Sequence, residues 1–131
     1  MSDSDSGSAA RDLPGDRDAD GASVDRALTD AVVRTLRALT GRGATSARGF
    51  INGDTAVVVM YDALTEGERN LVRKGHADQV KELRYTYQRA MADEVVPAVE
   101  QAVGRRVEAF MSANHVDPDH AVEVFILGDP L

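Results

Sequence analysis

The dipeptide Asn52-Gly53 constrains the fold more than any other feature of this sequence. It separates two runs rich in β-branched and apolar residues, and both of its residues accept the positive φ that the tightest β-hairpin turns require. We therefore expect one strand over residues 45–51 and an antiparallel partner over residues 55–61. The second run is apolar on both faces, because Val57 and Val59 alternate with further apolar residues. That pattern is typical of a strand that is central in its sheet or covered on both sides.

Apolar residues at helical spacing predict three helices, over residues 24–39, 66–74 and 77–103. Ser23 is a suitable N-cap for the first, and Thr65 with Glu68 forms a capping box at the start of the second.

In the third helix we expect the core-facing stripe to contain Val80, Leu83, Tyr87, Met91, Val95, Ala98 and Ala102. Arg84 is expected on a solvated face, and Tyr85 lies off the stripe, where it could sit at a subunit contact. Pro97 predicts a kink and Gly104 a stop.

A second hairpin is expected after Gly104, because residues 107–113 and 122–127 both alternate with period two. The order is then α-β-β-α-α-β-β. Two hairpins on either side of a helical middle predict an α+β fold, with one four-stranded antiparallel sheet and helices packed mainly on one of its faces. Such a small sheet leaves edges and one face to cover, so we also expect a homodimer.

The first 22 residues differ from the rest of the chain. They combine Ser, Asp and Gly with Leu13 as the only larger apolar residue after Met1, a composition that cannot bury enough surface to fold. We therefore expect a disordered acidic tail over residues 1–22 and a single domain over residues 23–131.

The overall composition narrows the possible compartments and partners. The net charge of −7 argues against nucleic acid as a partner, because phosphate binding needs a basic face. The chain has no cysteine, which excludes disulfides, thiolate metal sites and cysteine nucleophiles. No signal peptide and no apolar run of about 20 residues is visible, so we expect a cytoplasmic protein without direct membrane insertion.

The densest polar cluster follows the first strand of the second hairpin and contains Asn114, His115, Asp117, Asp119 and His120. Asp-Pro and Asn are turn formers, so the simplest interpretation is a tight connection between two strands. A second interpretation is a surface that recognises a protein partner or a small anion. A third is a metal site using imidazole and carboxylate ligands, although the spacing matches no strong metal signature.

The loop over residues 41–45 is the other candidate. Its glycines expose backbone amides, and Arg42 beside them could meet a carboxylate or a phosphate. The simpler interpretation is a loop that only joins the helix to the strand. We single out Arg42, Thr45, Asn114, His115, Asp117 and His120 as a ligand or partner surface. If Arg42, His115 and Asp117 cluster in space, an anion such as bicarbonate becomes conceivable. No complete catalytic constellation is visible, so we expect no enzyme, no cofactor and no metal.

Four segments together resemble the MpsC-type domain family: residues 41–45, 61–68, 114–119 and 122–125. The resemblance covers roughly residues 24–127. One departure is Ala44, where the family pattern leads us to expect proline.

The resemblance implies a soluble accessory or regulatory protein, because the family is named for the third component of a sodium-translocating, membrane-potential-generating system. Its role would be linked to bicarbonate or cation transport and would be exerted through a membrane transporter partner. Two alternatives stay open from the residues alone. One is a small metal- or anion-dependent enzyme, and the other is a stress or gene-expression regulator that acts through protein contacts.

Overall fold

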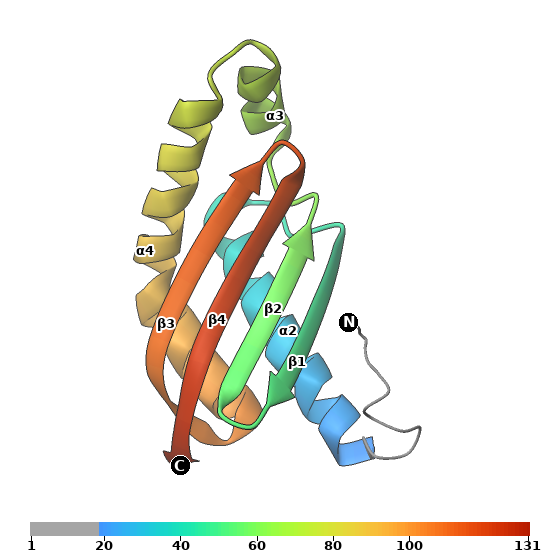
Figure 1. Cartoon of the computed structure of the whole chain (residues 1–131), viewed down its shortest axis with the longest axis vertical. Coiled ribbons are helices and arrows are strands. Elements are labelled where there is room, and N and C mark those ends of the chain that lie inside the picture. Colours follow the sequence, from blue (N-terminus) through green and yellow to red (C-terminus); the bar gives the residue numbers. More distant parts are fainter. Residues whose placement is uncertain (1–18) are drawn as a thin grey trace.

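The structure is a computed structural model that describes residues 19–131. Of the disordered tail predicted over residues 1–22, residues 1–18 lie outside the described part and residues 19–22 belong to the first helix. Figure 1 shows the elements in chain order: α2 (Ala19–Thr40), β1 (Ser46–Asn52), β2 (Thr55–Tyr61), α3 (Glu66–Arg73), α4 (Ala77–Val103), β3 (Arg105–Val116) and β4 (Asp119–Pro130). This order and the four antiparallel strands confirm the predicted α+β fold.

The first helix begins earlier than predicted. It starts at Ala19, so Ser23 lies inside it and is not its N-cap. Residues 19–22 are small or polar and add no large apolar position to the helical stripe, so hydrophobic periodicity could not detect them. At the other end Gly41 follows the helix with a φ of 81°, and its amide donates to the carbonyl oxygen of Arg37 at 2.9 Å.

The four strands lie in the order β1-β2-β4-β3, and every neighbouring pair is antiparallel. The predicted central position of β2 is confirmed, because it pairs with β1 on one side and with β4 on the other. The central pair joins distant parts of the chain, with Thr55 opposite Ile126 and Tyr61 opposite His120. β1 and β3 are the two edges of the sheet.

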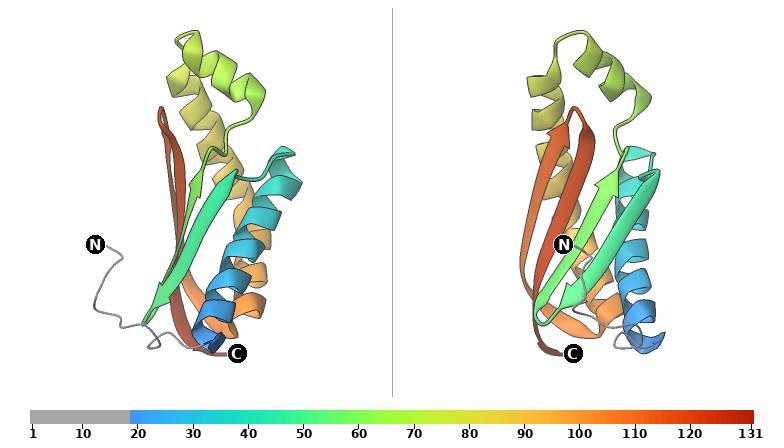
Figure 2. Two further views of the ribbon diagram at one scale, coloured as in Figure 1. Left: turned by 90° about the vertical axis from the view of Figure 1, so that its right-hand side faces the viewer. Right: turned by 45° about the vertical axis from the view of Figure 1, so that its right-hand side comes forward.

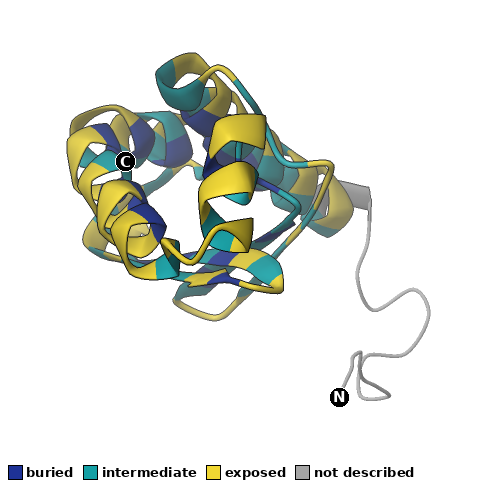
Figure 3. Cartoon of the chain, turned by 90° about the horizontal axis from the view of Figure 1, so that it is seen from above, coloured by how far each residue is buried: buried dark blue, intermediate teal, exposed yellow. Residues whose placement is uncertain are grey.

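Both long helices cover the same face of the sheet, as the edge-on view in Figure 2 shows. The core between them contains buried residues from α2, α4, β2 and β4, which Figure 3 shows between the layers. Phe125 lies in this core, fully buried, and stacks on Phe110 with 5.0 Å between ring centroids. The predicted arrangement of helices on one face is therefore confirmed.

A close approach of α2 to β1 depends on Gly49. A Cβ atom at this position would lie 2.0 Å from the hydroxyl oxygen of Thr29 and 3.4 Å from the backbone oxygen of Asp25. Glycine lets the helix lie against the strand here, because any side chain would overlap the helix.

The buried stripe of α4 differs from the prediction in its first half. Arg84 and Gln88 are buried, whereas Leu83 is 40% exposed. The prediction of a solvated Arg84 was therefore wrong, because polar partners on α3 and β4 stabilise its side chain and that of Gln88 in the interior. The second half follows the expected spacing, with Met91 and Val95 fully buried.

The second hairpin is longer than predicted. β3 ends at Val116 and β4 begins at Asp119, and the two residues Asp117–Pro118 form the turn between them. Asn114, His115 and His120 are therefore strand residues and not part of an irregular loop. Strand pairing explains the difference, because the ladder continues through polar residues that single-sequence patterns assign to turns.

Candidate functional site

The loops at one end of the sheet bring polar side chains together. The α2–β1 loop, the β2–α3 loop and the β3–β4 turn all lie at the end next to α3 (Figure 1). Asp62 binds two of these segments, because its amide donates to the carbonyl oxygen of Asp119 at 3.0 Å and its carbonyl accepts from Arg42 Nη2 at 2.9 Å.

Asp62 is also the centre of an ion-pair cluster. Arg42 Nη2 lies 3.1 Å from its Oδ2, Arg69 Nη1 pairs with its Oδ1, and the hydroxyl of Thr45 donates to its Oδ2. The same Arg42 nitrogen donates to Thr45 Oγ1 at 3.2 Å. Asp62 has a φ of 59°, a conformation that Asp tolerates better than most residues. The cluster therefore fixes two loops to each other through one carboxylate.

The electrostatics of the cluster follow from these contacts. The hydrogen bond from Thr45 lowers the pKa of Asp62 below its ordinary value, and the charges of Arg69 and Arg42 act in the same direction, against an opposing effect of desolvation. Glu66 accepts from Arg69 at 3.4 Å, so two carboxylates face the two guanidinium groups. An external anion at Arg42 would have to compete with Asp62.

The polar groups at the β3–β4 turn contact either the turn itself or the segment that leads from β2 to α3. His115 Nδ1 lies 2.8 Å from the carbonyl oxygen of Pro118, and the carboxylate of Asp119 accepts from the amide of Leu64 at 2.8 Å. The ring of His120 meets Tyr61 edge-on, with 5.3 Å between centroids. The turn is thereby anchored to the start of α3 and to the end of β2.

The structure brings some of the predicted site residues together and separates others. Arg42 contacts Thr45, and His115 is opposite His120 in the β3–β4 ladder. Among residues 19–131, no hydrogen bond or ion pair joins Arg42 to His115 or Asp117. Within the same range no three His, Cys, Asp or Glu side chains gather closely enough to hold a metal ion.

A buried polar network lies between α4 and the sheet. Glu123 on β4 is 1% exposed; it accepts a hydrogen bond from Ser112 on β3 and one at 3.4 Å from Gln88 on α4. One turn away, buried Arg84 donates to Glu68 Oε1 at 3.2 Å, and the amide of Thr65 donates to the same oxygen at 2.8 Å. The capping box of α3 is thereby joined to α4.

Burial dominates the chemistry of Glu123. Desolvation raises its pKa from 4.5 to about 7, although the hydrogen bonds from Ser112 and Gln88 and the charge of Arg84 lower it. A carboxyl group with such a pKa changes its charge in the neutral range.

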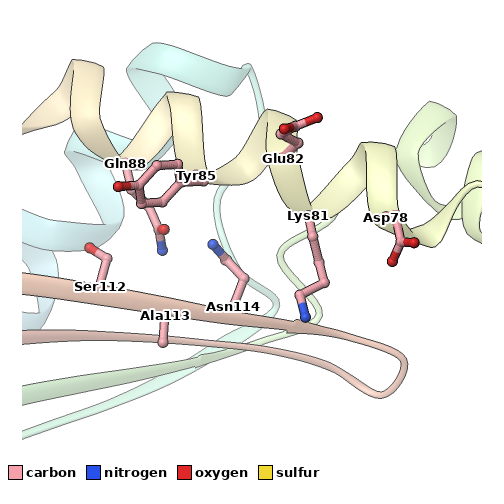
Figure 4. Close-up of a pocket in the computed structure, with 8 residues that line it drawn as sticks. All are labelled: Asp78, Lys81, Glu82, Tyr85, Gln88, Ser112, Ala113 and Asn114. Carbon is pink, nitrogen blue, oxygen red and sulfur yellow. The ribbon is translucent and has the colours of Figure 1, made fainter.

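A groove of about 470 Å³ opens above this network, between α4 and the edge strand β3. Figure 4 shows side chains from both elements along it, and its lining residues are Asp78, Lys81, Glu82, Tyr85, Gln88, Ser112, Ala113 and Asn114. Tyr85 is 56% exposed, as its predicted place off the core stripe requires. The groove combines amide, hydroxyl and charged groups with one large aromatic ring.

The family described as "Na+-translocating membrane potential-generating system (MpsC)" matches residues 21–129. The chain belongs to the MpsC family. The match confirms the resemblance carried by the loop and hairpin segments, and it extends over both long helices. No curated protein and no solved structure matches this MpsC chain. Within its described residues no helix is long and apolar enough to cross a bilayer.

The sequence prediction missed several polar residues that organise this MpsC domain. Asp62 follows β2 directly and precedes the capping box, and this position at the junction of a strand and a helix was the only signal for it. Glu123 stands between Val122 and Val124, on the same strand face as Phe125. A charged residue on the core-facing side of an alternating strand is the sequence pattern that could have identified Glu123 as a buried carboxyl group.

Proposed function

We propose that this MpsC-family chain is a cytoplasmic, non-enzymatic accessory component of a Na⁺-translocating, membrane-potential-generating system. In this proposal it regulates bicarbonate or cation transport by binding a membrane partner. The family match supports the link to such a system. The observation that carries the binding role is the groove between α4 and the β3 edge.

The edge of β3 offers main-chain hydrogen bonds beside this groove. The amide of Asp62 donates to the carbonyl oxygen of Asp119, and the amide of Leu127 donates to that of Asp54, so the odd-numbered residues of β4 direct their main-chain groups toward β2 and the even-numbered residues direct theirs toward β3. On β3, Asn114 is opposite the odd-numbered Ala121 and therefore occupies a non-hydrogen-bonded position. Its amide and carbonyl therefore point away from β4, toward the open edge. An extended segment of a partner could add there as a further strand.

The side-chain chemistry of the groove fits the same kind of occupant. Gln88 and Asn114 supply amides, and Tyr85 supplies an exposed aromatic ring of the type enriched in protein interfaces. The lower part of the edge is closed, because the amide of Val107 donates to Glu100 Oε2 at 2.9 Å. We therefore place the partner segment along residues 108–116.

Substitution at Asn114 tests this role. Asn114→Pro removes one outward amide and leaves the β3–β4 hydrogen bonds in place, because an edge strand tolerates proline at such a position. Asn114→Ala loses the same side chain but retains the amide, and it is the matched control. We expect Asn114→Pro to bind membrane vesicles that contain the family's Na⁺-translocating membrane components at least tenfold more weakly than this control. Equal vesicle binding by the two variants, or no binding by the natural chain, would contradict the proposal.

A direct bicarbonate site is a second candidate, favoured by one observation. Arg42 Nε is buried and has no hydrogen-bond partner among the described residues. A small anion beside it would satisfy this donor, at the cost of competition with Asp62. Calorimetric titration of bicarbonate into the natural chain and into Arg42→Ala distinguishes the cases, since saturable binding that the variant loses would support the site and no heat of binding would remove it.

A further inference from the structure

The face of the sheet opposite the helices is apolar over most of its width. The register aligns one row of side chains across all four strands: Phe50, Val57, Val124 and Met111. A second row contains Val59, Val122 and Ala113, and Ile126 with Ala109 extends the surface. Phe50 is 38% exposed and Met111 is 50% exposed. We call this surface the outer face.

No helix within residues 19–131 covers the outer face, because α2 and α4 both lie on the other side (Figure 2). Isolated apolar residues are normal on a surface, but contiguous apolar patches above a few hundred Å² mark interaction sites. The outward side of all four strands, polar rows included, spans roughly 600 Å² in projection at the standard strand spacing and rise. The accessible area of side chains exceeds this projection, and a standard interface buries about 800 Å² on each partner. The outward side of the sheet, with the outer face at its centre, therefore has about the size that a stable dimer needs.

Two charged side chains with no ion pair to any residue in 19–131 lie at opposite corners of the outer face. Arg48 on β1 is opposite Val59 and is exposed, with no ion pair to any residue in the described range. Glu108 on β3 is also exposed, and its carboxylate lies over Gly128, where a Cβ atom would be 2.2 Å away. Gly128 follows Val124 and Ile126 on the outward side of β4, which places Glu108 on this face.

The positions of these charges define how two copies can pack. Arg48 and Glu108 are three strand spacings apart across the sheet, about 14 Å, and about the same distance apart along the strands. The line between them therefore runs at about 45° to the strands. A two-fold axis in the interface, perpendicular to that line, exchanges the two corners and brings Arg48 of each copy over Glu108 of the other. The strands of the two sheets then cross at about 90°, which is one of the two favoured sheet packings.

We propose that the outer face binds a second copy of this chain, giving a two-fold dimer with near-orthogonal sheets and two reciprocal Arg48–Glu108 ion pairs. This interface uses the outward face of the sheet, whereas the vesicle-binding site uses the main-chain edge of β3 and the groove on the helix side, so the Asn114 and Val124 variants test the two sites independently. In this dimer the apolar rows of the two copies pack against each other, and the charged residues pair at the rim of the interface. An apolar centre with a polar rim is the usual anatomy of a specific interface.

Sedimentation velocity of the full chain, over a range of concentrations, tests the dimer. We expect a dimer for the natural chain and a monomer for Val124→Lys, which places a charge at the centre of the outer face. Circular dichroism checks that this variant is folded. A natural chain that stays monomeric at about 100 µM would overturn the proposal, and so would a folded Val124→Lys that dimerises as before.

A charge-reversal cycle tests the geometry without touching the apolar rows. Arg48→Glu and Glu108→Arg should each weaken the dimer roughly tenfold, since each reverses two contacts, and the double variant should restore most of the affinity. Additive losses would refute the orthogonal arrangement. A third outcome is a natural chain that is monomeric and a chain without residues 1–18 that is dimeric. This result would assign the outer face to that segment and would also overturn the proposal.

Discussion

Replacing Glu123 by glutamine should change how stability depends on pH. The folded state binds the proton of Glu123 more tightly than the unfolded state, because burial raises its pKa from 4.5 to about 7. Between these values the folded state holds more protons, so the free energy of unfolding falls as the pH rises. The stabilisation is complete below pH 4.5 and is lost as the pH passes 7.

The magnitude follows from the width of that interval. At about 1.4 kcal/mol for each pH unit, the interval between 4.5 and about 7 corresponds to about 3 kcal/mol. Glu123→Gln keeps the shape of the side chain and can exchange hydrogen bonds with Ser112 and Gln88 after rotation of one amide. At pH 8 the variant should be more stable than the natural chain by up to about 3 kcal/mol, and at pH 4.5 the two should differ by less than about 1 kcal/mol.

Urea unfolding followed by far-ultraviolet circular dichroism is the suitable assay, because the chain contains no Trp. Measurements at one protein concentration between pH 4.5 and 8 give the difference in unfolding free energy between variant and natural chain. Glu94→Gln, on an exposed position of α4, is the control and should show no pH-dependent difference. A difference for Glu123→Gln that is constant over this range, or a variant less stable at pH 8, would refute the reasoning.

Three further changes test contacts elsewhere. Arg84→Met should destabilise the fold by about 3–5 kcal/mol in urea unfolding, because it leaves the buried carboxylate of Glu68 unpaired, and adding Glu68→Leu should recover most of the loss; a second change that is merely additive would contradict the pairing. Gly49→Ala should cost about 1–3 kcal/mol through overlap with the Thr29 hydroxyl, and Thr29→Ala should relieve it, as thermal melts can show. Asp62→Asn should lower the melting temperature at neutral pH and have less effect near pH 3, because the depressed pKa of Asp62 confines its stabilisation to pH values above that pKa. An equal effect at both pH values would argue against the ion-pair cluster.

Local signals in the sequence were sufficient for elements that begin or end at residues with a strong preference for turns or helix ends. The bounds of β2 and α4 match the prediction, because Asn52-Gly53 precedes the strand and Gly104, with a φ of 74°, ends the helix. The capping box of Thr65 and Glu68 is present with both hydrogen bonds. In each case the determining interactions lie within a few residues along the chain.

The errors at buried polar positions arose because the deciding partner is distant in sequence. Gln88 is buried because Glu123, 35 residues away, accepts its hydrogen bond, and no local pattern reveals such a partner. The candidate site shows the same limit. Arg42 and Thr45 were predicted from their loop, but Asp62, which binds both, lies on another loop 20 residues beyond Arg42.

The strand order has a consequence for the kinetics of folding. Each hairpin can close locally on a microsecond timescale, but the central pairing of β2 with β4 requires the segment from Tyr61 to His120 to close as a loop. Until α3 and α4 have formed and brought these strands together, each hairpin exposes an unpaired edge and an apolar face. Long-range pairing of this kind slows folding, so we expect the β2–β4 ladder to form late, and amide hydrogen exchange during refolding should protect it after the two hairpin ladders.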